Sequence, residues 1–178
     1  MIQLEKPKNL GNWLRLYRLY MQAFPRAERK PWSMILRMHR KGKTDIWCVK
    51  VRSNFAGLAI TINSPDVILL DYFAIEKKKR GQSIGTRALK AILAQYADKG
   101  FFLEIESTLE DTPDRAMRLS RKKFYLSCGL EEMHTTAFLF GVKMELLGAG
   151  CRLDFDGYKS FYATYYNTWA ADHIMPAD

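Results

Sequence analysis

Apolar residues are densest between Val67 and Tyr96, and their spacing changes once within this stretch. From Val67 to Ile75 the apolar run is interrupted only by Asp71, which is typical of a strand covered on both faces. Apolar residues then recur at i, i+3, i+4 and i+7, the spacing of one helix face. These are Leu89, Ile92, Leu93 and Tyr96. The stretch therefore predicts a central strand, a basic turn that contains glycine, and a helix.

Two helices are expected before this central strand. The first follows Asn12, which suits an N-cap, and stops at Pro25 after a series of aromatic and apolar residues at helical spacing. The second begins near Pro31, a favourable residue for a first helical turn, and ends at Gly42. The link between the two helices, residues 24–31, is interpreted as a solvated turn.

Alternating and aromatic-rich segments predict the remaining strands. Residues 45–52 and 57–63 form two strands before the central one, separated by a short polar turn. After the central helix, which we expect to end at Gly100, residues 101–107 form a short strand that places Glu104 and Glu106 on the same face. Such a pair either lies on an exposed or salt-bridged face or serves a site.

The C-terminal part predicts a helix, two strands and a last helix. Residues 114–128 form the first helix, and residues 133–147 form two strands that are broken near Gly141. Asp156 is expected to cap the last helix, which carries an aromatic stripe at helical spacing. The stripe consists of Tyr158, Phe161, Tyr162, Tyr165, Tyr166 and Trp169. It favours core packing, or a contact in a homodimer, over a ligand site.

Length and composition narrow the class of protein. At 178 residues with 48% hydrophobic residues, the chain suits one ordered domain with a sizeable core. The N-terminus lacks the apolar core of a signal peptide, and no stretch reaches the roughly 18 apolar residues of a membrane span. The three cysteines, Cys48, Cys128 and Cys151, have no metal-type spacing. We therefore expect a reduced, cytoplasmic protein with no metal and no membrane partner.

A formal charge of +9 admits three kinds of partner: nucleic acid, an anionic membrane surface or a polyanionic cofactor. No zinc-finger spacing, RNA-recognition signature or Walker loop is present in the sequence. The basic residues cluster at the turn after the central strand, since Lys77–Arg80 precede it and Arg87 and Lys90 follow it. Glycine at a helix start lets an anion approach unpaired backbone N–H groups, so the turn suits a phosphate cradle. A plain strand-to-helix connection with a solvated charge run is the alternative.

Two motifs resemble the GNAT superfamily of N-acetyltransferases. The first, Arg80-Gly81-Gln82-Ser83-Ile84-Gly85, resembles the loop that holds the acetyl-CoA pyrophosphate; it matches at Arg80 and Gly85 and has serine where glycine is usual at Ser83. Serine suits that position if φ is below zero, whereas a positive φ counts against tight cofactor binding. The second, Phe124-Tyr125 followed by Gly129-Leu130, is similar to the family's second signature. The resemblance covers roughly residues 44–147.

The resemblance implies a mixed α/β fold with a mostly antiparallel central sheet, splayed central strands, helices on both faces and an extra C-terminal helix. It implies one domain, with a helix pair at 1–43, the sheet core at 44–147 and the aromatic helix and tail at 148–178. The link at residues 24–31 would then form part of the acceptor-pocket wall. Acetyl-CoA is the implied co-substrate, without a metal.

The resemblance also implies roles for individual residues. The main chain of Phe73, Ala74 and Ile75 would pair with the pantetheine arm, and the Phe73 N–H would face the thioester carbonyl. The diphosphate would be held by the loop and the start of the helix. The cofactor-binding residues of that segment are Arg80, Gly81, Gln82, Ser83, Ile84, Gly85 and Thr86. Tyr125 would be the general acid.

The base that deprotonates the amine is sought among the carboxylates. Glu104 and Glu106 are the first candidates, with Asp71 in reserve. The expected function is transfer of an acetyl group from CoA directly to a primary amine on a small molecule or peptide. The alternatives are a non-catalytic acyl-CoA-binding or regulatory domain, and, as a weaker alternative, a basic nucleic-acid-binding protein that uses residues 77–80 and 118–123.

The charged residues are compatible with two kinds of acceptor. The acidic pair favours a cationic amine, whereas the arginines near it would suit an acceptor that bears a carboxylate. These arginines are Arg26, Arg29, Arg115 and Arg118.

Overall fold

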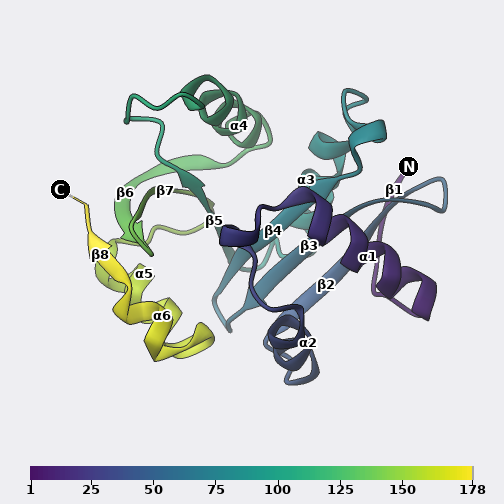
Figure 1. Ribbon diagram of the computed structural model, residues 1–178, viewed down its shortest axis with the longest axis horizontal. Helices are drawn as coiled ribbons and strands as arrows, with labels where there is room; N and C mark the ends of the chain where they lie inside the picture. The colour runs from purple at the N-terminus through teal and green to yellow at the C-terminus, as the bar shows by residue number, and fades with distance from the viewer. Residues whose placement is uncertain (178) are drawn as a thin grey trace. The chain divides into compact units, whose positions relative to one another are not determined.

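The computed structural model describes residues 1–177 as a mixed sheet with helices (Figure 1). Within these residues the strands follow the order β1-β2-β3-β4-β5-β7-β6-β8. Their bounds are β1 Ile2–Glu5, β2 Thr44–Val51, β3 Asn54–Asn63, β4 Val67–Ile75, β5 Gly100–Glu106, β6 Glu131–Leu139, β7 Val142–Ala149 and β8 Ile174–Pro176. The helices are α1 Leu10–Ala23, α2 Trp32–Arg40, α3 Ile84–Gln95, α4 Arg115–Ser127, α5 Phe155–Phe161 and α6 Thr168–Asp172. Short helical turns are η1 Arg26–Glu28, η2 Lys77–Lys79 and the π-helical η3 Tyr162–Tyr166.

The chain divides into two compact units. Unit 1 consists of Met1–Asn63 and Leu70–Tyr96, and unit 2 consists of Ser64–Leu69 and the chain from Ala97 onward. β4 contributes to both units, because its first three residues belong to unit 2 and the rest belong to unit 1. Each unit therefore has its own part of the sheet.

In unit 1, the sheet carries helices on both faces because neighbouring residues of a strand point to opposite sides. β1 pairs with β2, and β2 with β3, in antiparallel register. Cys48 of β2 lies in a cluster with Leu16 of α1 and Ile35 of α2. The next residue, Val49, lies in a different cluster with Ala88 of α3. Thus α1 and α2 cover one face of this part of the sheet and α3 covers the other.

In unit 2, β5, β7, β6 and β8 pair in antiparallel register. Phe102 of β5 packs edge-on against Phe161 of α5, with the ring centroids 5.0 Å apart. The register of β6 against β7 shifts between Glu132 and Thr136, and His134 adopts φ +57° there. This irregularity has the features of a β-bulge.

The ladder between β4 and β5 is short. The two strands are parallel and pair at Val67↔Gly100, Ile68↔Phe101 and Leu69↔Phe102. The register ends there, although β4 continues to Ile75 and β5 continues to Glu106. The predicted strand, turn and helix between Val67 and Tyr96 are confirmed as β4, η2 and α3. The predicted mixed, mostly antiparallel fold class is also confirmed.

The predicted N-caps of the first and last helices are wrong. Asn9 caps α1, and its Oδ1 accepts a hydrogen bond from the N–H of Asn12 at 2.9 Å. Asp154 caps α5 and accepts from the N–H of Gly157 at 2.8 Å, so Asp156 lies in the first turn. In both places two residues that suit a cap lie within three positions of each other, so residue type alone does not decide which one is used.

The single C-terminal helix is also a wrong prediction. Beyond Phe161 the chain forms the π-helical turn η3, and Asn167 is extended at φ −170° and ψ 156°. The Asn167 side chain accepts from the N–H of Ala170 at 2.7 Å and so starts α6 as a separate helix. Of the aromatic stripe, Tyr158, Phe161 and Tyr162 are buried as expected for core packing. Trp169 is instead 63% exposed.

One further difference concerns the end of the central helix, and two edge strands were not predicted. The central helix ends at Gln95, and Gly100 opens β5 rather than ending the helix. A Cβ at Gly100 would lie 2.5 Å from the Cβ of Cys151, so close packing explains this glycine. The edge strands β1 and β8 have no counterpart in the prediction, because strands of four and three residues leave little periodic signal.

Candidate active site

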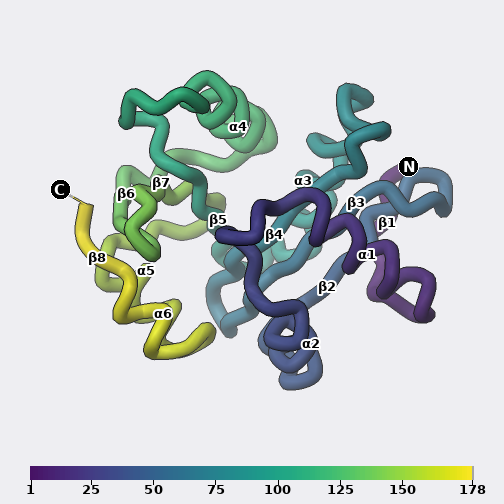
Figure 2. Tube along the Cα trace, in the orientation of Figure 1, coloured from purple at the N-terminus to yellow at the C-terminus, as the bar shows by residue number. Residues whose placement is uncertain are grey.

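The segment that resembles a diphosphate loop connects η2 to α3 in unit 1 (Figure 2). The backbone N–H groups of residues 81–86 donate to no other described residue. Those of Ile84, Gly85 and Thr86 open α3, where the helix macrodipole is positive. Six consecutive amides are therefore available to an anion.

Two arginine side chains bind backbone carbonyl oxygens in this loop and at the end of the strand before it. Nε of Arg80 donates to the carbonyl of Ile75 at 3.1 Å. Nε and Nη2 of Arg87 donate to the carbonyls of Ser83 and Gln82, each at 3.4 Å. These bonds use carbonyl oxygens only and do not involve the backbone N–H groups of residues 81–86.

Ser83 adopts the left-handed conformation, with φ 54° and ψ 15°. The condition under which serine suits this position, a negative φ, is therefore not met. The conformation costs a non-glycine residue about 1–2 kcal/mol, and the serine hydroxyl makes no capping bond in return. Gly81, at φ +74°, adopts a similar conformation without that cost.

The predicted pantetheine segment lies in the same unit, at the end of β4. Ala74 and Ile75 are buried and Phe73 is half-buried. Gly57 of β3 passes so close that a Cβ there would lie 2.4 Å from the Ala74 carbonyl oxygen. The N–H of Glu76 donates to the carbonyl of Ala56 at 2.8 Å and fixes the end of the strand. Unit 1 thus brings together the segments 73–75 and 80–86.

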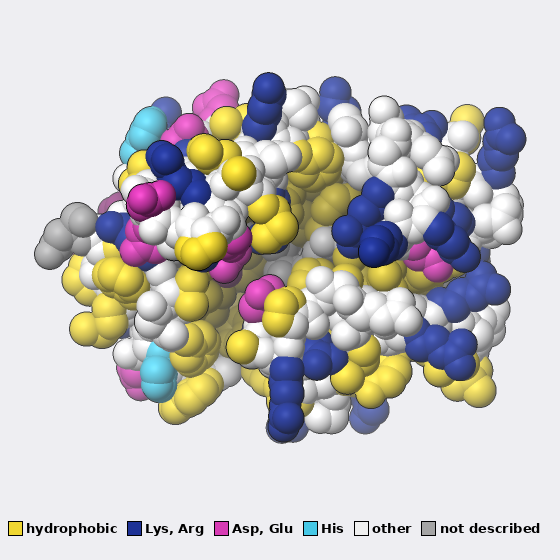
Figure 3. Space-filling model, turned by 45° about the horizontal axis from the view of Figure 1, so that its top comes forward, with side chains coloured by type: hydrophobic (Ala, Val, Ile, Leu, Met, Phe, Trp, Pro, Cys, Tyr) yellow, Lys and Arg dark blue, Asp and Glu magenta, His cyan; other side chains and the backbone are white. Residues whose placement is uncertain are grey.

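Charge is distributed unevenly between the units. Of the 28 Lys and Arg residues, 19 lie in unit 1, and of the 19 Asp and Glu residues, 14 lie in unit 2. The formal charges are thus +14 and −5, which together make +9. Figure 3 shows Lys and Arg side chains gathered over unit 1. The electrostatic attraction for a polyanion is therefore strongest in the unit that carries the open amides.

Asp71, the reserve candidate for a base, is paired within unit 1. It lies on β4 and forms an ion pair with Lys30. Burial raises the pKa of Asp71, and Lys30 opposes that shift. The hydroxyl of Tyr72 accepts from the Lys30 N–H at 3.1 Å and donates to the Glu28 carbonyl at 2.8 Å. The link after α1 is thus fixed to β4 through its backbone, while Arg26 and Glu28 are exposed.

Glu104 of unit 2 is bound by two tyrosines. The hydroxyls of Tyr158 and Tyr162 both donate to its Oε1 at 2.7 Å. Both tyrosines are buried, and Tyr162 opens the π-helical turn η3. Hydrogen bonds to one carboxylate oxygen stabilise the ionised form. Sequence analysis missed this role of the aromatic stripe, which combines core packing with polar contact.

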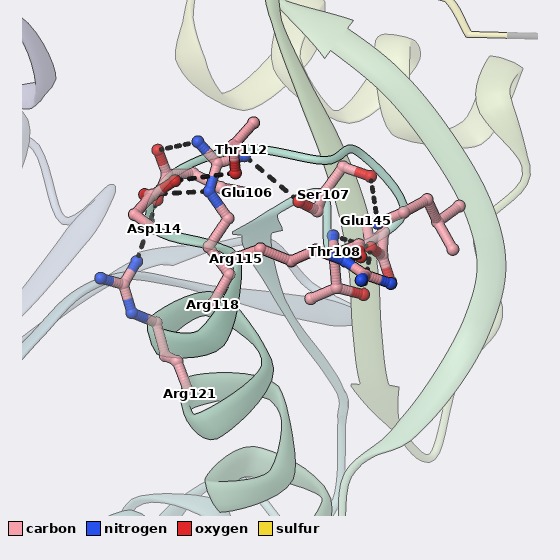
Figure 4. Close-up of polar contacts among 10 residues, drawn as sticks. Glu106, Ser107, Thr108, Thr112, Asp114, Arg115, Arg118, Arg121 and Glu145 are labelled. Atoms are coloured by element: carbon pink, nitrogen blue, oxygen red, sulfur yellow. Dashed lines mark hydrogen bonds and ion pairs between the residues drawn. The ribbon is translucent and has the colours of Figure 1, made fainter.

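Glu106 is on the same strand but has different partners (Figure 4). It forms ion pairs with Arg118 and Arg121 of α4, each at 3.4 Å. Arg118 also binds Asp114 at 3.0 Å, and Nε of Arg115 donates to the Thr108 carbonyl at 3.1 Å. Arg115 and Arg118, considered above for an acceptor carboxylate, are thus engaged within unit 2.

A buried ion pair near these residues was missed by the sequence analysis. Glu145 of β7 forms an ion pair with Lys122 of α4 at 2.6 Å, and their side chains are 8% and 12% exposed. The backbone N–H and the hydroxyl of Thr108 also donate to Glu145. Burial acts to raise the pKa of Glu145, but these bonds outweigh it, and the net shift is downward. The pair therefore fixes α4 to the sheet of unit 2.

Tyr125, the candidate general acid, lies on α4 and is half-buried. Burial raises its pKa, and the charge of Arg121 opposes that shift. Among the described residues its hydroxyl has no hydrogen-bond partner. Tyr125 is therefore a protonated phenol at neutral pH, and its hydroxyl is available to a ligand.

Two further properties concern residues 1–177 as a whole. No three His, Cys, Asp or Glu side chains in that range come together as metal ligands. In the same range, no helix is both long and apolar enough to cross a bilayer. The three cysteines are all free thiols.

Comparison with protein families decides the relationship. The family model described as "Acetyltransferase (GNAT) family" matches residues 13–129, more than half of the chain. The chain belongs to the GNAT acetyltransferase family. The matched range contains the loop of residues 80–86 and the second motif from Phe124 to Gly129, so the resemblance seen in the sequence is confirmed.

Solved GNAT structures share the fold. A GNAT-family acetyltransferase from Bacteroides thetaiotaomicron is 18% identical, with a TM-score of 0.77 over 93% of this chain and 98% of that chain. The ribosomal-protein-S18-alanine N-acetyltransferase from Escherichia coli is 13% identical, with a TM-score of 0.57 over 86% and 96%. The spermidine N-acetyltransferase from Vibrio cholerae, in complex with CoA and spermine, is 10% identical, with a TM-score of 0.62 over 83% and 94%. At these identities the likeness shows the GNAT fold alone. No curated protein matches the sequence.

Proposed function

We propose that this GNAT-family protein is an acetyl-CoA-dependent N-acetyltransferase that transfers acetyl directly to a primary amine. The observation that carries the proposal is the run of open amides at residues 81–86, at the start of α3 in the positively charged unit. A helix start with unpaired N–H groups is a site for diphosphate. Acetyl-CoA supplies the activated thioester, and the chain supplies binding, orientation and proton transfer.

The cofactor assignments follow the chain through unit 1. Residues 81–86 donate amide hydrogen bonds to the diphosphate, and Arg80 keeps the loop closed through Ile75. We assign the main chain of Phe73, Ala74 and Ile75 to the pantetheine arm, because strand backbone can pair with an extended ligand. The Phe73 N–H is assigned to the thioester carbonyl, where a preoriented donor stabilises developing negative charge.

Proton transfer is assigned to unit 2. Tyr125 is the general acid for the leaving thiolate, since its raised pKa keeps it protonated and its hydroxyl has no partner among residues 1–177. We rank Glu104 first for the amine, either as base or as an anchor for the ammonium group, because hydrogen bonds from two tyrosine hydroxyls position its carboxylate. Glu106 ranks second because two arginines already bind it. Asp71 ranks third because Lys30 neutralises it.

We also propose a cellular compartment and a class of acceptor. Three free thiols suit a reducing compartment, so we propose a cytoplasmic protein. The acceptor is a primary amine on a small molecule or a peptide, and the charge of −5 on unit 2 favours a cationic acceptor over an acidic one. Nucleic acid is disfavoured, because Arg118, Arg121 and Lys122 of the second basic segment form ion pairs with Glu106, Glu132 and Glu145.

One observation favours a second function, an acyl-CoA-binding domain without turnover. Ser83 adopts a positive φ at a loop position where the family usually has glycine, and this conformation stores strain at the cofactor site. Such a domain would bind acetyl-CoA and would release no CoA thiol.

Two measurements separate these functions. Titration calorimetry with acetyl-CoA should show saturable binding, and the absence of binding at millimolar cofactor contradicts both. Thiol release from acetyl-CoA is then followed with spermidine, a peptide with a free α-amine and a lysine peptide. Release with any of them supports the transferase, and binding without release across a broader amine panel supports the regulatory domain.

A further inference from the structure

A second basic feature of unit 1 lies outside the residues assigned above. Two adjoining hollows of about 200 and 290 Å³ lie between α1 and the turn that follows β4. They share Leu19, Gln22 and Glu76, so they form one groove, called here the α1–η2 groove. The remaining lining residues are Arg15, Arg18, Lys77 and Lys78.

One side of the groove is formed by residues of α1 that the helical repeat places on one face. Arg15, Arg18 and Gln22 are spaced i, i+3 and i+7, which places them on one face of the helix. Leu16 and Tyr20 are buried against the sheet, so the polar face points outward. Two arginines one turn apart repel each other and weaken a helix slightly, a cost that an anion between them would remove.

The other side of the groove is set by η2. Four basic residues follow Glu76, but only two of them bind the protein. Lys79 donates to the Phe55 carbonyl and lies 3.6 Å from Glu76, and Arg80 binds the Ile75 carbonyl. Lys77 and Lys78 are exposed and bind no described residue through their side chains.

The charge balance of the groove therefore favours an anion. Among the described residues, Arg15, Arg18, Lys77 and Lys78 have no acidic partner, and the one carboxylate of the groove is shared with Lys79. Guanidinium groups bind phosphate oxygens in pairs, and lysines add compact positive charge. Gln22 can donate through its side-chain amide.

We propose that the α1–η2 groove binds a phosphate monoester. A dianionic phosphate matches a site with four unpaired cations better than a single carboxylate does. The phosphate has two sources: the 3′-phosphate of CoA, since Lys78 precedes Arg80 of the diphosphate loop by two residues, or a separate phosphorylated molecule. The first source rests on the proposed function, and the second does not.

Arg15→Ala/Arg18→Ala tests the proposal, with Arg37→Ala/Arg40→Ala as a matched control. The control pair has the same i, i+3 spacing on α2, is exposed and removes the same charge. Titration calorimetry with inorganic phosphate at fixed ionic strength should show at least a tenfold loss of affinity in the first variant and less than a twofold loss in the control. Equal losses in both variants, or none in the first, overturn the proposal. Thermal unfolding confirms that both variants fold.

CoA and 3′-dephospho-CoA distinguish the two sources. If the coenzyme supplies the phosphate, the Arg15/Arg18 variant loses at least tenfold affinity for CoA and little for dephospho-CoA. If a separate molecule supplies it, both coenzymes bind the variant as they bind the wild-type protein, while inorganic phosphate still binds more weakly. Failure of the wild-type protein to bind either coenzyme contradicts the proposed function and leaves the phosphate result to decide the groove.

Discussion

Unit 1 and unit 2 handle charge in different ways. Unit 1 carries +14, and four of its five acids are already in ion pairs, so its surplus of cations is left for ligands or solvent. Unit 2 carries −5, and ion pairs join Arg118, Arg121 and Lys122 of α4 to Glu106 of β5 and Glu145 of β7. The contrast teaches that the basic character of the whole chain comes from one unit. It also separates the attraction of a polyanion, in unit 1, from the fixing of the candidate proton-transfer side chains, in unit 2.

The largest expected effect is on the stability of unit 2. Lys122→Met leaves Glu145 buried without its cation and should lower the free energy of unfolding by about 3 kcal/mol. Lys123→Met is the matched control, because Lys123 is exposed and binds no described residue through its side chain. Chemical denaturation followed by fluorescence measures both. Equal stability of the two variants would show that the pair contributes nothing.

The same pair predicts a pH dependence. Because the net pKa of Glu145 is lowered on folding, its contribution to stability is present above its unfolded pKa of about 4.3 and is lost as pH falls through the folded value. The stability difference between wild type and Lys122→Met should therefore shrink below about pH 4.3. A difference that stays constant from pH 7 to pH 3 contradicts this origin.

The second effect separates turnover in unit 2 from binding in unit 1. Tyr125→Phe removes the proposed acid and should lower kcat about 10²–10³-fold, with acetyl-CoA affinity unchanged. Tyr17→Phe, on an exposed tyrosine of α1, is the control. Stopped-flow thiol release gives kcat, and calorimetry gives the affinity. An undiminished kcat removes Tyr125 from the mechanism.

The third effect tests binding in unit 1. Gly85→Glu places a carboxylate among the open amides and should weaken acetyl-CoA binding about 100-fold, or about 2.7 kcal/mol. The fold should survive, because an acidic residue in the first turn suits the dipole of α3. Gln95→Glu adds the same charge at the other end of α3 and should change the affinity little. Similar losses in both variants would indicate a long-range charge effect instead of contact.

The smallest effect concerns Ser83. Ser83→Gly removes the cost of a left-handed serine and should stabilise the protein by about 0.5–1 kcal/mol, with equal or tighter acetyl-CoA binding. Ser83→Ala retains the strain and should give no such gain. Differential scanning calorimetry compares the two variants. A weaker affinity in Ser83→Gly would show that the serine hydroxyl contacts the cofactor.

The two units also differ in how far sequence predicts them. The loop at residues 80–86 is local, because its strand, glycines and helix adjoin in the chain. The apolar run predicted the strand, and the helical spacing of apolar residues predicted the helix. The polar contacts of unit 2 join distant residues: Glu104 meets Tyr158 and Tyr162 more than 50 positions away. Spacing identified Glu104 as a candidate, but no pattern in one sequence pairs it with a tyrosine. The same holds for Lys122 and Glu145, which lie 23 positions apart.

Local ambiguity accounts for the other errors. Asn9 and Asn12 both suit a cap, and their residue type does not distinguish them. In the sequence, Asn167 fits an ordinary position within the predicted aromatic helix. In the structure, its extended backbone separates η3 from α6. The sequence does not indicate the sign of φ at Ser83, because a serine gives no signal for the left-handed conformation that the structure shows there.

β4 belongs to both units, and this has a consequence for dissecting the molecule. Neither unit is a continuous segment, since residues 64–69 of one are inserted between the two halves of the other. A fragment that stops at Tyr96 would retain Val67, Ile68 and Leu69 without the β5 residues that pair with them. Limited proteolysis at any single bond cannot release either unit intact, so the proposed cofactor and acceptor roles have to be separated by point substitution in the uncut 178-residue chain.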